Sequence, residues 1–296
     1  MTSDGRTDPA RSCEAARMRF AIKTSPQHTT WADMLAVWQA ADDIDLFESA
    51  WTFDHFYPIF SDPTGPCLEG WITTTALAQA TTRLRIGVLV TGNPYRHPAL
   101  LANMAATLDI ISGGRLELGL GAGWNQEESD AYGIDLPPLK ERFDRFDEAL
   151  EVITRLLTDT TSTFEGQHYQ LRDARCEPKP LQQPHPPICI GGSGPNRTLR
   201  SVARWAQHWN HPGGSPDQLR EAIEVLHERC AEIDRDPSEI LISTHLRVDA
   251  ADPAAVEAQV IAAEAAGIQL GIVYLPTPHT PAVLEPLAHV LQPLAG

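Results

Sequence analysis

The length, composition and charge of the chain exclude several classes of protein. With 296 residues, 42% of them hydrophobic and 21% charged, it has the composition of an ordinary globular protein, and no apolar run approaches the ~18–20 residues that a membrane-spanning helix requires. The formal net charge of −16 argues against binding along a nucleic-acid backbone, because that needs clustered Lys and Arg. We therefore expect neither nucleic acid nor a membrane as a partner.

The N-terminal segment and the cysteines suggest what lies around the folded part. Residues 1–17 carry three arginines but no following apolar stretch, so they do not form a secretory signal. We predict a disordered leader over 1–17 and a single domain over 18–296. The five cysteines are widely spaced and include no C-x-x-C pair, which favours reduced thiols over a disulfide framework or a zinc site.

Short β-rich runs alternate with helical patterns along the rest of the chain. The clearest helical pattern starts at Pro98, repeats apolar residues from Leu100 to Ile111 at i, i+3/i+4 spacing, and stops at Gly113. Further helices are predicted over 141–157, 215–234 and 253–266. Eight strands are predicted, each followed by a helix: RFAIKT (19–24), SAWTF (49–53), RIGVLV (85–90), RLELGL (115–120), PICIGG (187–192), QHWN (207–210), EILISTHLRV (239–248) and LGIVYL (270–275).

This alternation fits either a closed (β/α)8 barrel or an open doubly wound sheet. A dinucleotide-binding sheet is disfavoured, because Trp124 and Arg197 stand where the two glycine-rich turns would need the third glycine of G-x-G-x-x-G. We therefore predict an α/β fold of the TIM-barrel type. Residues 158–186 are polar and rich in proline, and we interpret them as an insertion between strands four and five, with a small hairpin that turns at Gly166.

In such a barrel the active site lies at the C-terminal ends of the strands, so the residues that follow each strand are the candidates. Strand two runs into Asp54 and His55. A carboxylate beside an imidazole can steer a proton or orient a polar edge of a ligand. The alternative interpretation is that Asp54 caps local backbone while His55 packs against Phe56 and Tyr57.

Strands three and four end in small residues. The run from Val88 to Asn93 lets backbone approach a planar ligand, although it also suits an ordinary turn before a helix. The alternating glycines from Gly119 to Gly123 remove side chains where something must come close to the main chain. Asn125 with Glu128 resembles a capping box, which would start a helix whose N-terminus could face a phosphate, or simply a capped helix without a ligand.

The end of strand five carries the strongest site signal that follows from the residues alone. Gly191-Gly192-Ser193-Gly194 leads through Arg197 into a helix, which offers backbone N–H groups, a hydroxyl and a guanidinium to a phosphate. Glycine-rich turns without ligands are the alternative. Metal and serine catalysis are not supported, because the imidazoles of His208 and His211 lack a third ligand at metal-like spacing and no G-x-S-x-G elbow occurs.

Taken together, these segments resemble the luciferase-like family of oxidoreductases, and most closely its actinobacterial F420-dependent branch. The resemblance implies a flavin or deazaflavin lying over the strand ends, hydride transfer at its ring, and a homodimer. The segments that carry it are WTFDHF (51–56), TGNPYRHPALLANMAATLDIISGGRLELGLGAGWNQEE (91–128), AYGI (131–134), ERFDRFDEAL (141–150), CEPKPLQQPHPPICIGGSG (176–194) and RTLR (197–200).

The resemblance also implies roles for single residues. Asp54 and His55 would lie near the ring or the substrate as catalytic residues, and the backbone of strand three would form a bulge, often with a non-prolyl cis peptide, that supports the ring. The residues expected to bind the cofactor end strands three, four and five: Val88, Leu89, Val90 and Thr91; Gly121, Ala122, Gly123 and Trp124; Gly191, Gly192, Ser193 and Arg197.

Two departures bear on the substrate. Trp124 stands where the sugar-phosphate dehydrogenases of this family carry a glutamate, and Ile59 where they carry a tryptophan, which argues against glucose-6-phosphate. The leading hypothesis is an F420-dependent oxidoreductase in which His55 donates or accepts a proton. The alternatives are an FMNH2-dependent monooxygenase that works with O2 and a separate flavin reductase, and a non-catalytic cofactor-binding protein.

Overall fold

The alternating segments close into a barrel, as the sequence predicts. The structure is a computed structural model that describes residues 17–249, 252 and 254–296. In this part of the chain eight parallel strands follow one another around the ring, and the pairing of β3 with β5 closes it. The strands are β1 (Arg19–Lys23), β2 (Phe47–Thr52), β3 (Arg85–Val88), β5 (Leu116–Gly121), β8 (Ile188–Gly191), β9 (His208–His211), β10 (Leu241–Arg247) and β11 (Leu270–Tyr274).

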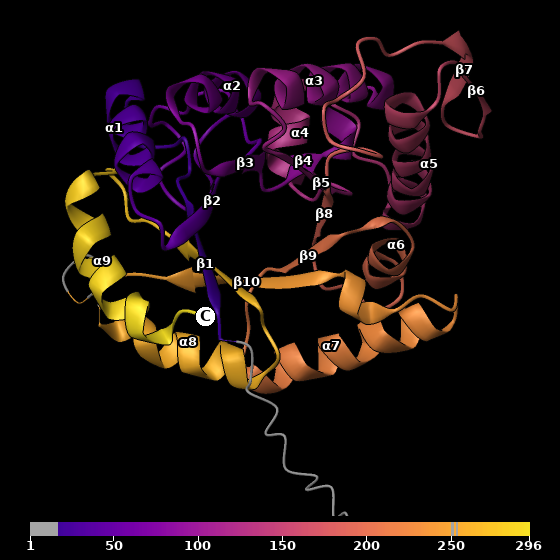
Figure 1. Cartoon of the computed structure of the whole chain (residues 1–296). Helices are drawn as coiled ribbons and strands as arrows, with labels where there is room; N and C mark the ends of the chain where they lie inside the picture. The colour runs from indigo at the N-terminus through magenta and orange to yellow at the C-terminus, as the bar shows by residue number, and fades with distance from the viewer. Residues whose placement is uncertain (1–16, 250–251, 253) are drawn as a thin grey trace, which may run out of the picture.

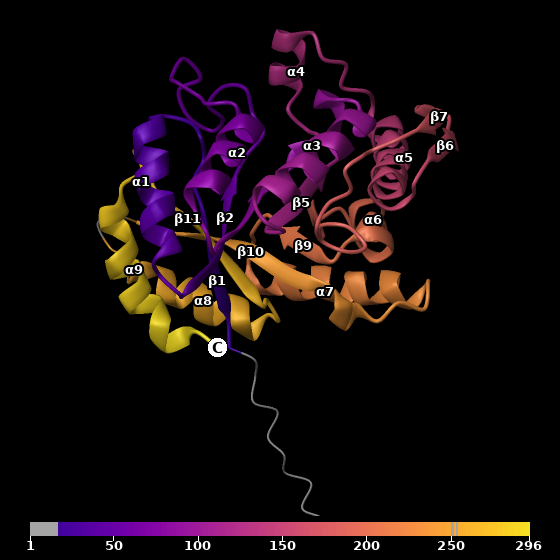
Figure 2. The ribbon, with the colours of Figure 1, turned by 45° about the horizontal axis from the view of Figure 1, so that its top comes forward.

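Helices surround the strands, with α1 to α3 along one side of the ring and α7 and α8 along the opposite side (Figure 1). The short helix α4 (Gln126–Tyr132) stands apart from this layer, beyond the ends of α2 and α3 (Figure 2). The other helices are α1 (Trp31–Asp42), α2 (Gly70–Ala80), α3 (Pro98–Ile111), α5 (Leu139–Thr158), α6 (Thr198–Trp205), α7 (Pro216–Ala231), α8 (Ala255–Ala265) and α9 (Leu284–Leu291). None of the described helices is long and apolar enough to cross a membrane.

Local sequence explains where the helices begin and which face they bury. Thr30 caps α1 through a reciprocal capping box with Asp33, and α5 buries the predicted stripe that includes Phe146 and Leu150. Helix α3 differs from the prediction, because Leu100 is 56% exposed and the small residues of the helix are buried in its place. The apolar residues of α3 therefore divide between the core and an outer surface.

The segment between the fourth and fifth barrel strands contains the predicted hairpin. Strands β6 (Ser162–Glu165) and β7 (Gln170–Ala174) pair antiparallel, and they lie beyond α5 at the edge of the molecule (Figure 1). The carboxylate of Glu148 on α5 accepts the backbone N–H groups of residues 167–169 at 2.8–3.0 Å, which fixes the turn of the hairpin to the helix. Residues 1–16 of the predicted leader lie outside the described residues, and the single-domain boundary stays a prediction.

Side chains of the strands divide into two buried layers. Those that face outward join the helices in the main core. Alternate side chains point into the barrel, where a smaller apolar cluster fills its middle. This inner cluster consists of Ala21, Trp51, Leu89, Cys189, Leu270 and Ile272. The polar residues on either side of this cluster define two chemically different ends of the barrel.

Candidate active site

Two adjoining cavities occupy the C-terminal ends of the strands. The smaller, of about 240 Å³, is enclosed by the ends of β5 and β8 and by α5; the larger, of about 450 Å³, opens over the ends of β1, β10 and β11. Five of the lining residues are common to both cavities, namely His55, Val90, Trp124, Gly191 and Gly192. The two cavities therefore form one continuous hollow in the barrel mouth, which is where the sequence predicts the site.

The residues that follow β3 line both cavities, since Val90 borders each of them and Leu89 borders the larger one. The Leu89–Val90 peptide bond is cis, at the position where the resemblance implies a bulge of this kind. The N–H of Leu89 donates to the carbonyl of Thr52 at 3.0 Å, and its own carbonyl accepts the Lys23 ammonium at 2.7 Å. Val88 is buried beneath the bulge. The backbone at Leu89 and Val90 is thereby held from two neighbouring strands.

The glycines of strands four and five make room for this bulge. A Cβ atom on Gly119 would lie 1.9 Å from the Val88 carbonyl oxygen, and one on Gly121 would lie 2.8 Å from the side chain of Val90. A Cβ atom on Gly191 would approach the same side chain to 3.0 Å. The close approach to the main chain that the glycine spacing predicts is therefore made by Val88 and Val90 of the protein and not by a ligand. Gly121 and Gly191 nevertheless also line the hollow.

His55 is held in the hollow by a buried carboxylate that the sequence did not associate with it. Its Nδ1 lies 2.7 Å from Glu128 Oε2, which also accepts the hydroxyl of Tyr95 at 2.6 Å, while Oε1 accepts the N–H of Phe56. A carboxylate at Nδ1 assigns the proton to that nitrogen. Nε2 has no hydrogen-bond partner in the described part of the chain, so it is the nitrogen left for a ligand.

This arrangement corrects the predicted capping box. Asn125 does cap α4 by accepting the N–H of Glu128, but the Glu128 side chain does not return to the cap. It crosses instead to β2. Burial acts to raise the pKa of Glu128, but hydrogen bonds from His55, Tyr95 and Phe56 outweigh burial and lower it. Glu128 is therefore an anion, and its position on α4 places the carboxylate against the imidazole of His55.

The structure does not bring the side chain of Asp54 to the hollow. Its carboxylate is buried and receives two hydrogen bonds from Arg96, at 2.5 and 3.0 Å. Burial raises the pKa of Asp54 to about 6 against the opposing effect of Arg96. This pair ties the end of β2 to the segment before α3, so Asp54 supports its neighbour His55 from behind the cavity wall.

Two exposed aromatic rings form the rim of the hollow. Trp124, 53% exposed, stacks on Phe60, 89% exposed, with ring centroids 5.5 Å apart and an interplanar angle of 2°. Trp124 also meets the ring of His55 edge-on at 5.5 Å. Ile59 lines the larger cavity beside them. Both positions at which the chain departs from the sugar-phosphate dehydrogenases therefore lie at the entrance to the hollow.

The turn after β8 has the predicted backbone but a different arrangement of side chains. Arg197 pairs with Asp144 and Asp147 of α5, at 2.6 and 3.3 Å, and its guanidinium is not part of the cavity lining. Ser193 faces a neighbouring cleft of about 370 Å³ between α6 and α7. No side chain caps the start of α6, so what remains at the predicted phosphate site is Gly192, Ser193 and the backbone N–H groups of that helix.

The other predicted cofactor residues lie at different depths. Ala122 and Gly123 line the smaller cavity together with Gly121. Thr91 is buried and its hydroxyl accepts the indole N–H of Trp71 at 2.9 Å, so this side chain faces α2 and not the hollow.

At the opposite end of the barrel lies an ion-pair network that the sequence did not reveal. Glu117 receives Arg85 at 2.7 Å and His208 at 2.9 Å, and the second nitrogen of His208 contacts Ser243 at 2.7 Å. Although burial acts to raise it, the pKa of Glu117 falls to about 2 beside His208 and Arg85. Although burial acts to lower it, the pKa of His208 rises to about 10 beside Cys189 and Glu117. We call these four residues, Arg85, Glu117, His208 and Ser243, the floor network.

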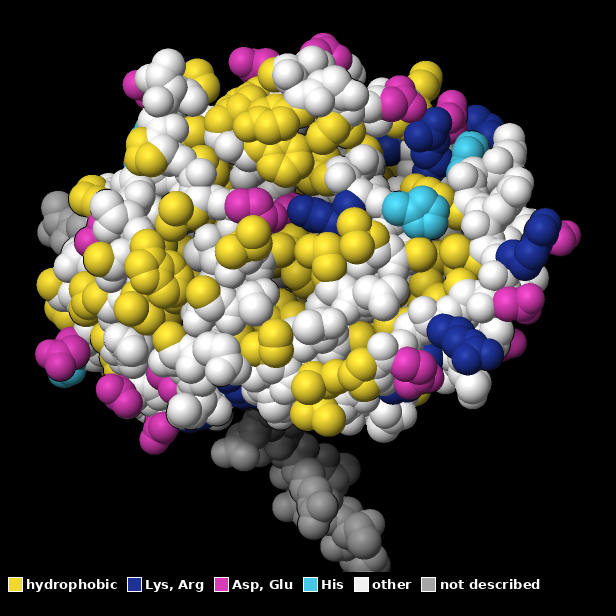
Figure 3. Space-filling model, turned by 90° about the horizontal axis from the view of Figure 1, so that it is seen from above, with side chains coloured by type: hydrophobic (Ala, Val, Ile, Leu, Met, Phe, Trp, Pro, Cys, Tyr) yellow, Lys and Arg dark blue, Asp and Glu magenta, His cyan; other side chains and the backbone are white. Residues whose placement is uncertain are grey.

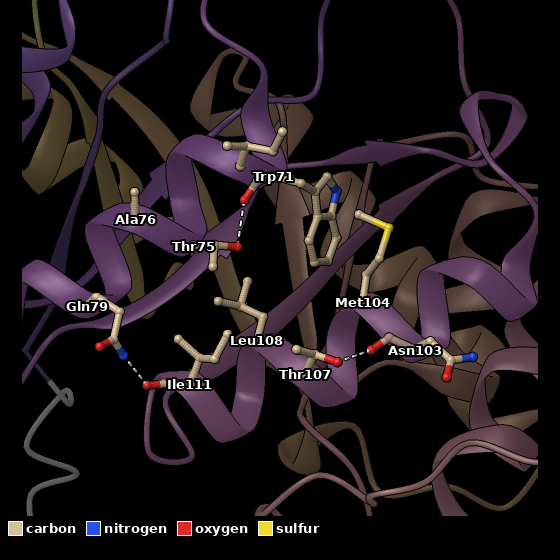
Figure 4. Close-up of a pocket in the computed structure, with 10 residues that line it drawn as sticks. Trp71, Thr75, Ala76, Gln79, Asn103, Met104, Thr107, Leu108 and Ile111 are labelled. Carbon is tan, nitrogen blue, oxygen red and sulfur yellow. Dashed lines mark hydrogen bonds between the residues drawn. The ribbon is translucent and has the colours of Figure 1, made fainter.

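A further cavity lies outside the barrel. It is a groove of about 820 Å³ between α2 and α3, and Figure 4 shows Trp71, Met104 and Leu108 along it. Its polar side chains are turned to nearby backbone, since Thr75 donates to the carbonyl of Trp71 and Gln79 to that of Ile111. None of the residues that line it is charged. The groove therefore offers no acid, base or nucleophile, and the barrel mouth remains the candidate active site.

The barrel with a continuous hollow at its C-terminal end defines the class as a (β/α)8 enzyme. Residues 18–292 match the family described as luciferase-like monooxygenase, so the chain belongs to this family of enzymes. This confirms the family and the fold predicted from the sequence.

Individual relatives place the chain near F420-dependent members of the family. It is 36% identical over 158 residues to an uncharacterized protein of Mycobacterium tuberculosis, which is 53% of this chain and 52% of the relative. It is 32% identical over 180 residues to an F420-dependent glucose-6-phosphate dehydrogenase of Amycolatopsis mediterranei, 60% of this chain and 53% of that protein. These matches span little more than half of each relative.

A solved structure resembles the chain over a longer span. An F420-dependent secondary alcohol dehydrogenase in complex with an F420–acetone adduct superimposes with a TM-score of 0.83. The match covers 95% of this chain and 100% of the other at 20% identity. At this identity the likeness establishes the shared fold.

Proposed function

We propose that this protein is a cytoplasmic F420-dependent oxidoreductase that moves a hydride between the deazaflavin and a small organic substrate. The observation that carries the proposal is the hollow at the barrel mouth, where the bulge at Leu89 and Val90 faces the imidazole of His55 across one continuous space. The F420-dependent relatives and the F420-dependent alcohol dehydrogenase of the same fold support it.

The residues present fit such a cofactor. The smaller cavity has walls of glycine, alanine and aromatic carbon without a charged group, which suits a planar ring system and its linker. It leads toward the start of α6, where Gly192, Ser193 and uncapped N–H groups can receive a phosphate. In this role Arg197 would act at longer range, because its guanidinium is already paired with Asp144 and Asp147.

When bound, the deazaflavin supplies a carbon that accepts or donates a hydride. The protein contributes support and a proton. The bulge at Leu89 and Val90 would support the ring, and the stacked side chains of Trp124 and Phe60 would border the entrance. His55 holds or releases a proton at Nε2, while Glu128 fixes the tautomer and stabilises the charged imidazole.

The same geometry bears on the substrate. The sugar-phosphate dehydrogenases carry a glutamate where this chain has Trp124, so an indole replaces a carboxylate at the entrance. Ile59 adds a branched aliphatic side chain there. Apolar groups there leave the hydroxyl groups of a sugar without hydrogen-bond partners, which is costly. We therefore propose a substrate less polar than a sugar phosphate.

A binding titration of the purified protein against oxidised F420, FMN and FAD, followed by fluorescence, tests the cofactor assignment. We expect tight binding of F420 and weak binding of FMN. Ala122→Phe, which fills the smaller cavity, should abolish F420 binding, and Ala231→Phe on the exposed end of α7 should not. Preference for FMN would replace the proposal with a reduced-flavin monooxygenase. Tight F420 binding without turnover across a broad substrate panel would indicate a cofactor-sequestering protein.

We also propose that the enzyme is a homodimer that meets its copy at the α2–α3 groove. A chain with a net charge of −16 repels its own copies, so the contact favours an uncharged face. The groove is uncharged, and Ile72 beside it is 75% exposed. Figure 3 looks onto the side on which α2 and α3 lie, and it shows apolar side chains over much of this face, with some charged side chains among them and others toward the edge. Light scattering should report a dimer that Ile72→Glu converts to a monomer.

A further inference from the structure

The larger cavity carries cations that the proposed reaction does not use. Lys23, Tyr274 and Arg247 end three neighbouring strands in one register row, β1, β11 and β10. The Lys23 ammonium lies 4.6 Å and the Arg247 guanidinium 5.3 Å from the centre of the Tyr274 ring. His245, two residues before Arg247 on the same side of β10, meets that ring edge-on at 4.9 Å. We call Lys23, His245 and Arg247 the mouth cluster.

Among the described residues, no carboxylate balances the mouth cluster. The side chains that line the cavity include Lys23 and Arg247 but no Asp or Glu, and neither cation forms an ion pair within the described ranges of the chain. Lys23 is only 3% exposed, and its one hydrogen bond is to the carbonyl of Leu89. A buried ammonium without a counter-charge is unfavourable, because it has lost its water and gained no anion. Because acidic residues far outnumber basic ones in this protein, the lack of a carboxylate beside Lys23 indicates that the counter-charge comes from a ligand.

The imidazole of His245 adds an independent observation. Its Nε2 is buried and has no hydrogen-bond partner in the structure as described. Burial, with the charges of Lys23 and Arg247 nearby, holds the pKa of His245 well below its usual range. The ring is therefore neutral and has a backbone hydrogen bond with Pro212, while its Nε2 is the buried atom beside the cavity without a partner. Buried polar atoms are nearly always paired, so this one indicates a missing group.

We propose that the larger cavity binds the carboxylate of an apolar organic acid, with the mouth cluster as its anion site. The cations supply the counter-charge, and the guanidinium of Arg247 matches a carboxylate in shape. The opposite wall is apolar and consists of Phe53, Ile59, Phe60 and Trp124. A carboxylate on an aromatic or aliphatic body satisfies both walls at once. This inference rests on the proposed function, for which it names the substrate class.

The donors at the mouth cluster favour a carboxylate over a phosphate. They are side chains at strand ends, and no helix N-terminus contributes to this cavity. The backbone N–H groups that typically hold a phosphate lie instead at the start of α6, on the far side of Gly191 and Gly192. The two anion sites therefore serve different groups, the cofactor's phosphate and the substrate's carboxylate.

Isothermal titration of the full chain with phenylacetate and with phenylacetamide, each with and without F420, tests the proposal. The two probes have the same size and differ in charge. We expect phenylacetate to bind roughly tenfold or more tightly than the amide, and to bind equally well or better once F420 is present. Arg247→Gln should remove the preference, while Lys140→Gln, a lysine exposed on α5, should leave it unchanged.

Each other outcome has a definite meaning. Equal binding of acid and amide would overturn the anion site. Displacement of phenylacetate by F420 would assign the cations to the cofactor, and displacement by equimolar inorganic phosphate would overturn the choice of a carboxylate. Lys23→Met, checked for folding by circular dichroism, should also remove the preference and gives a second test in case Arg247→Gln alters the end of β10. If F420 does not bind while the preference for the acid persists, the proposed function fails and the anion site stands.

Discussion

The two ends of the barrel hold similar charged side chains in opposite states. In the floor network Glu117 has both Arg85 and His208 within 2.9 Å, so every charge has its partner inside the protein. In the mouth cluster Lys23 is buried like Glu117 and His208, yet it faces an aromatic ring and a carbonyl instead of a carboxylate. The apolar layer that contains Trp51 separates the two ends.

The presence or absence of a partner distinguishes buried charges that stabilise the fold from buried charges that are available to bind a ligand. A buried ion pair loses much stability when one member is removed, because the other is left without a counter-charge. A buried ion that has no partner gives no such penalty when it is replaced by an apolar group. Burial alone therefore does not identify a functional residue, whereas the absence of a partner does.

Removal of a floor charge should have the largest effect. Glu117→Gln leaves His208 and Arg85 without their anion, and we expect it to lower the free energy of unfolding by about 3–5 kcal/mol. Urea unfolding followed by circular dichroism measures the change. Glu141→Gln is the matched control, since Glu141 pairs with Arg145 on the exposed surface of α5 and should cost less than about 1 kcal/mol. Equal losses in the two variants would contradict the comparison.

Replacement of Glu128, which holds the imidazole of His55, should affect activity more than stability. Glu128→Gln places an amide N–H₂ among donors from His55, Tyr95 and Phe56, and removes the negative charge that supports the imidazole. We expect kcat for F420-linked turnover to fall by about 10–100-fold with KM little changed. The exposed neighbour Glu127 supplies the control, Glu127→Gln. A rise in KM without loss of kcat would mean that Glu128 shapes the cavity without positioning His55.

The smallest change in stability should follow from replacement of Lys23 in the mouth cluster. Lys23→Met keeps the length of the side chain, loses the hydrogen bond to the Leu89 carbonyl and removes a buried charge that has no carboxylate partner. These two effects oppose each other, so the free energy of unfolding should stay within about 1 kcal/mol of the unmodified protein. Differential scanning calorimetry, run beside Glu117→Gln, gives the comparison directly. A loss as large as that of Glu117→Gln would show that Lys23 holds the fold through Leu89.

Much of the fold could be predicted because it depends on short-range patterns. Alternating β-rich and helical segments, the start of α3 at Pro98 and the turn at Gly166 all follow from spacing and turn chemistry within a few residues. Leu100 was placed on the wrong face because a helical stripe does not reveal whether a second surface also takes apolar residues.

The site was less predictable, because its key contacts join distant segments. The pair of Glu128 with His55 spans 73 positions, and the side chain of Glu128 had a competing local interpretation as half of a capping box. The pair of Glu117 with His208 spans 91 positions. The partners of Arg197 on α5 were hidden for the same reason. A signal did exist for Glu117, which is the one charged residue of β5, whereas His208 lies in β9 beside other polar residues.

The bulge at Leu89 and Val90 has a consequence for redesign of the enzyme. A Cβ atom on Gly119 would clash with the backbone of Val88, while one on Gly121 or Gly191 would press on the side chain of Val90, so substitution should be least tolerated at Gly119. The rim residues Phe60 and Trp124 are exposed, and they pack chiefly on each other. Selection for new substrates can therefore vary the rim while the glycines stay constant, which leaves the smaller cavity unchanged as specificity diversifies.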